Sequence, residues 1–60
     1  MTIWKVEIEE LTFDRGLFTG YKELGYWKDE NKAKDYADKY YNSRCKITEG
    51  KIKITPIKVN

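Results

Sequence analysis

Residues 29–43 read Asp-Glu-Asn-Lys-Ala-Lys-Asp-Tyr-Ala-Asp-Lys-Tyr-Tyr-Asn-Ser. Apolar residues recur there at intervals of three and four, the spacing of one face of an α-helix: Ala33, Tyr36, Ala37, Tyr40 and Tyr41. Asp29 is suited to the N-cap, because its carboxylate accepts a backbone N–H from the first turn. Asn42 and Ser43 compete for backbone hydrogen bonds and favour an end. The stretch predicts a helix over residues 30–43 that buries the first four of these apolar residues.

The chain before this helix shows the period of two that is typical of a half-buried strand. The alternating residues are Trp4, Val6 and Ile8 on one side, and Lys5, Glu7 and Glu9 on the other. Leu11 and Phe13 break the phase, and a bulge near Glu9-Glu10 would re-aim them. We therefore predict a strand from Thr2 to Phe13. A glycine-bearing loop over residues 14–20 and a second strand over residues 21–27 complete a hairpin.

A further strand is predicted after the helix, where Ile52 and Ile54 alternate with lysines and a threonine. Pro56 lacks an N–H and belongs at an edge or a bulge. Ile47 lies across Glu49-Gly50, which either turns a short extra hairpin or forms a plain loop. The prediction is an α+β two-layer sandwich, β-β-α-β or β-β-α-β-β. Its sheet is antiparallel or mixed, the helix covers one face, and the other face shows Lys5, Glu7, Lys51 and Lys53 to water.

The size of the chain limits how it is stabilised. Sixty residues make one domain with a small core. One cysteine and no histidine exclude an internal disulfide and a structural zinc site. Tight packing or self-association, such as a homodimer, remains. No apolar stretch approaches 18 residues and the N-terminus lacks a signal-peptide pattern, so we expect no membrane partner and a cytoplasmic location.

Catalytic chemistry finds little support in the sequence. The absence of histidine removes the commonest general base and excludes Ser-His-Asp and Cys-His arrangements. Arg44 and Lys46 flank Cys45 and would lower its pKa, but a lone cysteine is more often a small buried hydrophobe. The scattered glycines form no phosphate-binding loop. We expect a protein without enzymatic activity, cofactor or metal.

Two sets of residues are candidates for binding. Leu17 and Phe18 are apolar residues inside a polar loop, and they either anchor a partner or fold back as a lid on the core. The second set, a candidate contact for an anionic ligand, is Arg44, Lys46, Lys51 and Lys53. Residues 1–30 carry a net charge of −3 and residues 44–60 a net charge of +4. These basic residues either favour nucleic acid or keep an edge strand soluble.

The stretch from Leu24 to Ala37, Leu-Gly-Tyr-Trp-Lys-Asp-Glu-Asn-Lys-Ala-Lys-Asp-Tyr-Ala, resembles a pattern in short, uncharacterised proteins of phages and Gram-positive bacteria. In these proteins a strand ending in glycine and aromatic residues leads into a capped helix. The resemblance covers about a quarter of the chain and implies a small accessory protein, without functional residues. A weaker likeness is to the arm-type DNA-binding domains of tyrosine integrases, which place three strands before the helix where this chain has two.

The expected function is therefore a small protein-binding module, for example a phage accessory protein or an inhibitor acting on a host protein. The alternative is a weak nucleic-acid-binding domain that uses the basic C-terminal strand.

Overall fold

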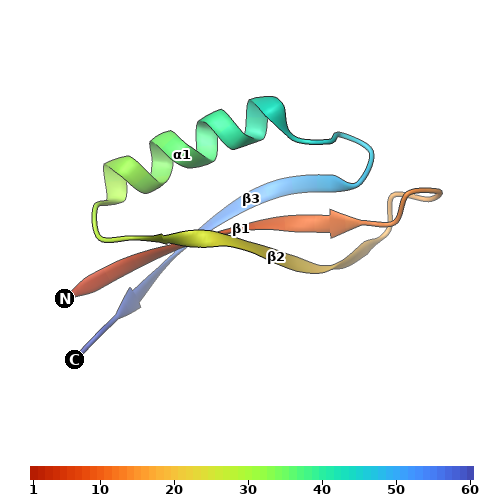
Figure 1. Cartoon of the computed structure of the whole chain (residues 1–60). Coiled ribbons are helices and arrows are strands. Elements are labelled where there is room, and N and C mark those ends of the chain that lie inside the picture. The colour runs from red at the N-terminus through yellow and green to blue at the C-terminus, as the bar shows by residue number, and fades with distance from the viewer.

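The computed structural model describes the whole chain, residues 1–60. Its elements are β1 (Thr2–Leu11), β2 (Phe18–Trp27), α1 (Glu30–Ser43) and β3 (Glu49–Lys58). The strands form one antiparallel sheet in the order β2-β1-β3, and α1 lies across one face of it (Figure 1). The predicted two-layer α+β sandwich is confirmed in its β-β-α-β form. The alternative with an extra strand is wrong, because Ile47 lies in a turn between α1 and β3.

The central strand supplies the most deeply buried side chains. Val6 and Ile8 have no solvent-accessible surface, since β1 has a strand on each side and the helix above it. Trp4 and, from β3, Ile52 and Ile54 pack on the same core. The residues between them lie on the face away from the helix, where Lys5 Nζ is 3.5 Å from a carboxylate oxygen of Glu7. The predicted division of polar and apolar residues between the two faces is confirmed.

An extra residue in β2 changes the face of the sheet on which its side chains lie. Consecutive residues of β1 pair with Gly25 and Glu23, so Leu24 has no partner of its own. Because of this bulge, Leu24 and Trp27 both pack on the core although an odd number of positions separates them. Gly25 has a φ of 155°, and a Cβ there would lie 3.0 Å from the ring of Trp27. A larger residue would therefore displace the indole.

A second irregularity falls in β1 where the sequence predicts a bulge. The β1–β3 register shifts between Ile8 and Glu10, and the Glu9 side chain takes up the freed donor: Lys51 N donates to Glu9 Oε1 at 2.7 Å. The sequence suggested that this bulge would re-aim Phe13 towards the core. The structure shows that it does not. β1 ends at Leu11, and Phe13 lies in the following turn with 75% of its surface exposed.

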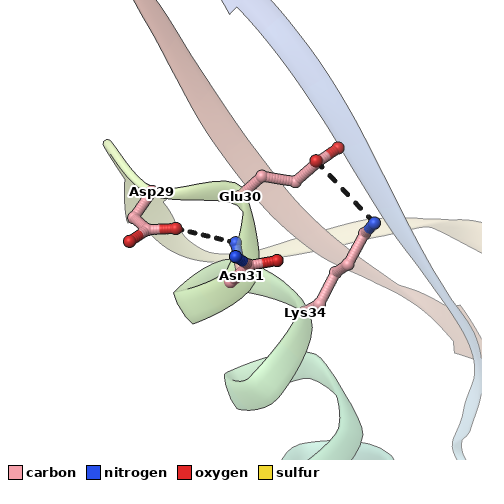
Figure 2. A network of polar contacts seen from close by, with 4 residues as sticks. All are labelled: Asp29, Glu30, Asn31 and Lys34. Carbon is pink, nitrogen blue, oxygen red and sulfur yellow. Dashed lines mark hydrogen bonds and ion pairs between the residues drawn. The ribbon is translucent and has the colours of Figure 1, made fainter.

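The helix begins and ends where the sequence predicts. Asp29 is the N-cap, and its Oδ1 accepts a hydrogen bond of 2.9 Å from the backbone N–H of Asn31 (Figure 2). Glu30 and Lys34 form an ion pair of 3.8 Å one turn apart, on the exposed side of the helix (Figure 2). Ala33 and Ala37 are buried against Val6. Their small side chains let the helix approach the sheet closely.

The two tyrosines that the sequence predicts to be buried in the helix stripe are less buried than expected. Tyr36 is 37% exposed, and its ring lies beside that of Trp27, with centroids 4.5 Å apart. Tyr40 is half-buried and donates its hydroxyl proton to Glu49 at 2.5 Å. The prediction that both tyrosines are buried is wrong, because each has its ring at the margin of the contact between the helix and the sheet, Tyr36 beside Trp27 and Tyr40 beside Glu49.

The core is small for the surface that it must stabilise. Only four residues are buried, and the chain measures 41 × 22 × 11 Å. Its accessible surface is 4551 Å², against about 4,100 Å² for a typical folded monomer of this mass. Much apolar surface therefore stays in contact with water.

Candidate functional site

The loop that joins β1 to β2 has a defined backbone. Thr12 N donates to the Leu17 carbonyl at 2.8 Å, and Gly16 N donates to the Thr12 carbonyl at 2.9 Å. The Thr12 hydroxyl also accepts from Leu17 N at 3.0 Å. Gly16 has a φ of 64°, a left-handed conformation that favours glycine. Together these bonds close the turn over residues 12–17 and set the directions of the side chains on it.

Bulky apolar side chains gather at this end of the hairpin. Phe13, Leu17 and Phe18 are 75%, 56% and 54% exposed, and Tyr21 is 45% exposed. The rings of Phe18 and Tyr21 meet edge to face, with centroids 5.2 Å apart. We call these four residues the hairpin tip patch. Singly exposed apolar residues are ordinary on a protein surface, but several that share one loop are typical of a binding site.

Leu17 and Phe18 do not form a lid on the core, which was the other interpretation of these residues. The hairpin extends past the α1–β3 connection at the end of the molecule (Figure 1), so the tip has no helix above it to pack against. β2 also begins at Phe18 rather than at Tyr21 as predicted, because the strand continues through Gly20, whose positive φ of 149° is a conformation that favours glycine. Phe18 is thus a strand residue that pairs with Leu11.

The structure separates the four candidate basic residues into two groups. Arg44 follows the helix, where its guanidinium lies 3.7 Å from the ring centroid of Tyr41 and donates to the Tyr41 carbonyl at 2.6 Å. Lys46 lies in the turn after it. Lys51 and Lys53 are exposed residues of β3; Lys53 is the cross-strand partner of Glu7, and Lys51 also lines a groove beside α1. The sequence had suggested one basic surface, and the chain folds them apart.

Acidic residues are interleaved with the lysines on the open face. Glu7 pairs across the sheet with Lys53, and Glu9 lies beside Lys51. Lys53 Nζ also lies 5.3 Å from the ring centroid of Tyr21, which brings the open face into contact with the hairpin tip patch. The face therefore carries mixed charge, which differs from the continuous positive surface that phosphate groups prefer.

The remaining reactive side chains have structural partners. Cys45 is exposed, and hydrogen bonds lower its thiol pKa, first from the Thr48 side chain and then from the backbone of Ile47 and Thr48. The sequence suggested the flanking basic residues as the cause, and they are not the main one. The favoured interpretation of Cys45 as a small buried hydrophobe is wrong, because the residue is exposed. The Ser43 hydroxyl donates to the Lys39 and Tyr40 carbonyls, as expected at a helix end. No group of three or more histidine, cysteine, aspartate or glutamate side chains is arranged to hold a metal ion.

Hydrogen bonds among three residues connect the helix to the start of β3. The carboxylate of Glu49 accepts from the Tyr40 hydroxyl at 2.5 Å and from Cys45 N at 3.0 Å. The Tyr40 hydrogen bond is the main reason that the pKa of Glu49 lies below its usual value. The same bond is the main cause of the rise in the pKa of Tyr40 to about 12. Sequence reasoning missed this contact, since it joins residues whose proximity depends on the turn between them.

Sequence reasoning also missed two members of the hairpin tip patch. Phe13 was assigned to the first strand and Tyr21 to the second, where the alternation of apolar residues favours burial. The length of the loop could have indicated this exposure, because so short a loop cannot carry a phenylalanine side chain back to the core. Their exposure depends on where the helix ends in space, which the local pattern does not contain.

Comparisons with known proteins found no match that indicates a function. The chain matches no family model, and neither a curated protein nor a solved structure matches it. No helix of the structure has the length and apolar character needed to cross a membrane.

Proposed function

We propose that the chain is a small, non-enzymatic protein-binding module that presents its hairpin tip patch to a partner protein. The observation that carries the proposal is the exposure of Leu17 and Phe18 by more than half, at the end of a hydrogen-bonded loop and the start of β2. A few bulky apolar side chains dominate the energy of most protein interfaces.

The order of the loop strengthens this argument. Binding normally costs free energy because loops and side chains lose conformational freedom in the complex. Here the bonds between Thr12 and Leu17 and the conformation of Gly16 already fix the turn. The contact between the Phe18 and Tyr21 rings restrains two of the side chains. The backbone of the turn and two side chains of the patch are therefore already ordered in the free chain.

The resemblance of residues 24–37 to short phage and Gram-positive proteins supports a role as an accessory protein or inhibitor acting on a host protein. The proposal places this interaction in the cytoplasm, where the exposed free thiol of Cys45 suits the reducing conditions. No observation favours the nucleic-acid alternative, because the structure disperses the basic residues and sets Glu7 and Glu9 among the lysines.

A capture experiment with matched variants tests this function. The immobilised chain is incubated with host lysate with and without nuclease, beside Leu17→Ser/Phe18→Ser and a control, Ile47→Ser. Ile47 is 55% exposed in a different turn, so the control makes the same chemical change elsewhere. We expect a nuclease-resistant protein to be retained by the wild-type chain and the control. Its retention by the double variant should fall by roughly tenfold or more, the effect of losing an anchor.

Thermal melts of the three chains complete the test. Because both tip residues are more than half exposed, Leu17→Ser/Phe18→Ser should lower stability by less than the ~3–5 kcal/mol typical of truncating one buried phenylalanine. A large loss of melting temperature would contradict the exposed position of the patch. Equal capture by all three chains, or capture only without nuclease, would remove the proposal.

A further inference from the structure

The outer edge of β3 has free backbone hydrogen-bonding groups. β3 is an edge strand whose inner side pairs with β1. Val59 N donates to the Met1 carbonyl at 2.8 Å, and Met1 N donates to the Val59 carbonyl at 3.2 Å. An antiparallel ladder alternates from such a pair, so the odd-numbered residues of β3 before the register shift is reached, from Ile57 back to Lys53, bond inward. The N–H and C=O groups of Ile52 and Ile54 then point outward.

A groove lies directly beside these outward-pointing groups. It has a volume of about 700 Å³ between α1 and β3. Four of its nine lining residues are apolar (Ala37, Tyr41, Ile52 and Ile54), and the polar ones include Lys51 and two aspartates of the helix, Asp35 and Asp38. The groove exists because Ala37 is short and the sheet has no fourth strand under this side of the helix. Ile52 and Ile54 are only half-buried although both face the helix layer. A further strand beside β3 would send alternate side chains into this space.

The opposite face of the same edge carries positive charge without ion-pair partners. The ion pairs of the chain join Lys5 to Glu7, Lys34 to Glu30, and Lys39 to Asp35. Lys51 and Lys53 are exposed and take part in none of them; Lys51 also lines the groove, and Lys53 Nζ lies 5.3 Å from the ring centroid of Tyr21. A strand added to β3 would place the side chains of its second face opposite these two lysines, where carboxylates are favoured over ammonium groups.

On its inner side, β3 already pairs with a strand in which apolar and acidic residues alternate. On that side Val6, Glu7 and Ile8 of β1 pair with Ile54, Lys53 and Ile52. β3 is therefore complementary to a strand in which apolar and acidic residues alternate. The outer edge has the same side chains, because each residue of a strand is shared by its two edges.

We propose that the outer edge of β3 over residues 50–55 binds an extended segment of a partner protein in which apolar and acidic residues alternate. The segment adds an antiparallel strand to the sheet through the main-chain groups of Ile52 and Ile54. Its apolar side chains fill the groove, and its carboxylates lie opposite Lys51 and Lys53. Pro56 ends the site, because it lacks the N–H that the next outward position would offer.

This surface goes beyond the hairpin tip patch, and it does not need that patch to function. A second copy of the chain is a poor occupant. An antiparallel pairing of two β3 strands that sets Ile52 opposite Ile54 also sets Lys53 opposite Lys53, and like charges directly opposite are destabilising.

A pair of synthetic peptides tests the proposal. The first alternates valine with glutamate, the second alternates valine with lysine, and both have blocked ends. Each is titrated into the full ¹⁵N-labelled chain, and amide shifts and hydrogen exchange are followed. We expect the glutamate peptide to shift the amides of β3 and to slow exchange at Ile52 and Ile54. The lysine peptide should bind roughly tenfold more weakly or worse, since two favourable charge pairs become repulsive.

Matched variants locate the site. Ile54→Pro removes one outward N–H at an edge position where proline is tolerated, whereas Ile54→Val keeps that N–H in a side chain of similar size. We expect the proline variant to lose binding of the glutamate peptide and the valine variant to keep it. Lys51→Gln/Lys53→Gln should reduce the preference for glutamate over lysine, and it provides a readout even where Ile54→Pro does not fold.

Three outcomes would overturn the proposal. They are the absence of binding, shifts centred on β2 or on the hairpin tip patch, and equal affinity for both peptides. Sedimentation of the free chain as a dimer, with Ile52 and Ile54 protected from exchange, would show that a second copy covers the edge instead.

Discussion

The bond between Tyr40 and Glu49 makes the stability of this protein depend on pH at both ends of the scale. The pKa of Glu49 is lowered in the folded state. The stability that its ionised carboxylate contributes is therefore present above its ordinary pKa of 4.5 and is lost as the pH falls. The pKa of Tyr40 is raised from 10.0 to about 12. Its contribution is therefore present below pH 10 and is lost as pH rises towards 12.

We expect Tyr40→Phe to reduce stability at neutral pH by about 1 kcal/mol, the net value of one hydrogen bond. Melting temperature measured against pH should show a weaker acid and alkaline decline in this variant than in the wild-type chain. Tyr41→Phe is the control, because no hydrogen bond joins the Tyr41 hydroxyl to another residue of the chain. Parallel pH profiles for Tyr40→Phe and wild type would contradict the role of the bond.

Gly50 is required by space rather than by backbone conformation. A Cβ at this position would lie 2.8 Å from Glu9 Oε1 and 3.2 Å from Glu9 Cβ, and Glu9 Oε1 accepts the hydrogen bond of Lys51 N. Gly50→Ala should therefore displace the carboxylate and cost about 1–3 kcal/mol, measured by urea unfolding. In a Glu9→Ala background the same change should cost less, because the nearest contact is gone. Equal costs in the two backgrounds would contradict this explanation.

At the scale of the element, the helix depends on its contact with the sheet. A helix of this length is marginal in water by itself, and Ala37 lies in the contact with Val6. Ala37→Asp would bury an unpaired carboxylate, at a cost that rivals the whole stability of so small a domain. We expect most of the population to unfold at room temperature, as followed by circular dichroism.

Lys32→Asp is the matched control for this helix prediction, since Lys32 is exposed on the outer side of α1. It should melt within a few degrees of wild type. An Ala37→Asp chain that melts normally would show that the helix–sheet contact contributes little.

For the whole molecule, the small core predicts a low stability. With four buried residues, we expect an unfolding free energy at or below the ~3–5 kcal/mol of a typical core of this size, from urea unfolding at several protein concentrations. A midpoint that does not change with concentration fits a monomer whose exposed apolar residues serve a partner. A midpoint that rises with concentration would show that self-association supplies the missing burial.

Local patterns in the sequence determined the elements of this protein. The helix over residues 30–43 follows from the spacing of alanines and tyrosines and from the cap at Asp29, because neighbours in the chain decide both. The alternation around Val6 determined which face of β1 is buried. The loop that leads through Leu17 to the start of β2 at Phe18 was recognisable for the same reason, since glycines and polar residues mark it.

Only the tertiary structure decided what those elements do together. Whether Phe18 is a lid or an exposed anchor depends on how far the helix reaches over the hairpin, and that distance involves segments far apart in the chain. The separation of Arg44 from Lys51 depends on the path of the turn between α1 and β3. The free edge of β3 and its groove exist because three strands lie under one helix, a property of the assembled sheet that no single segment contains.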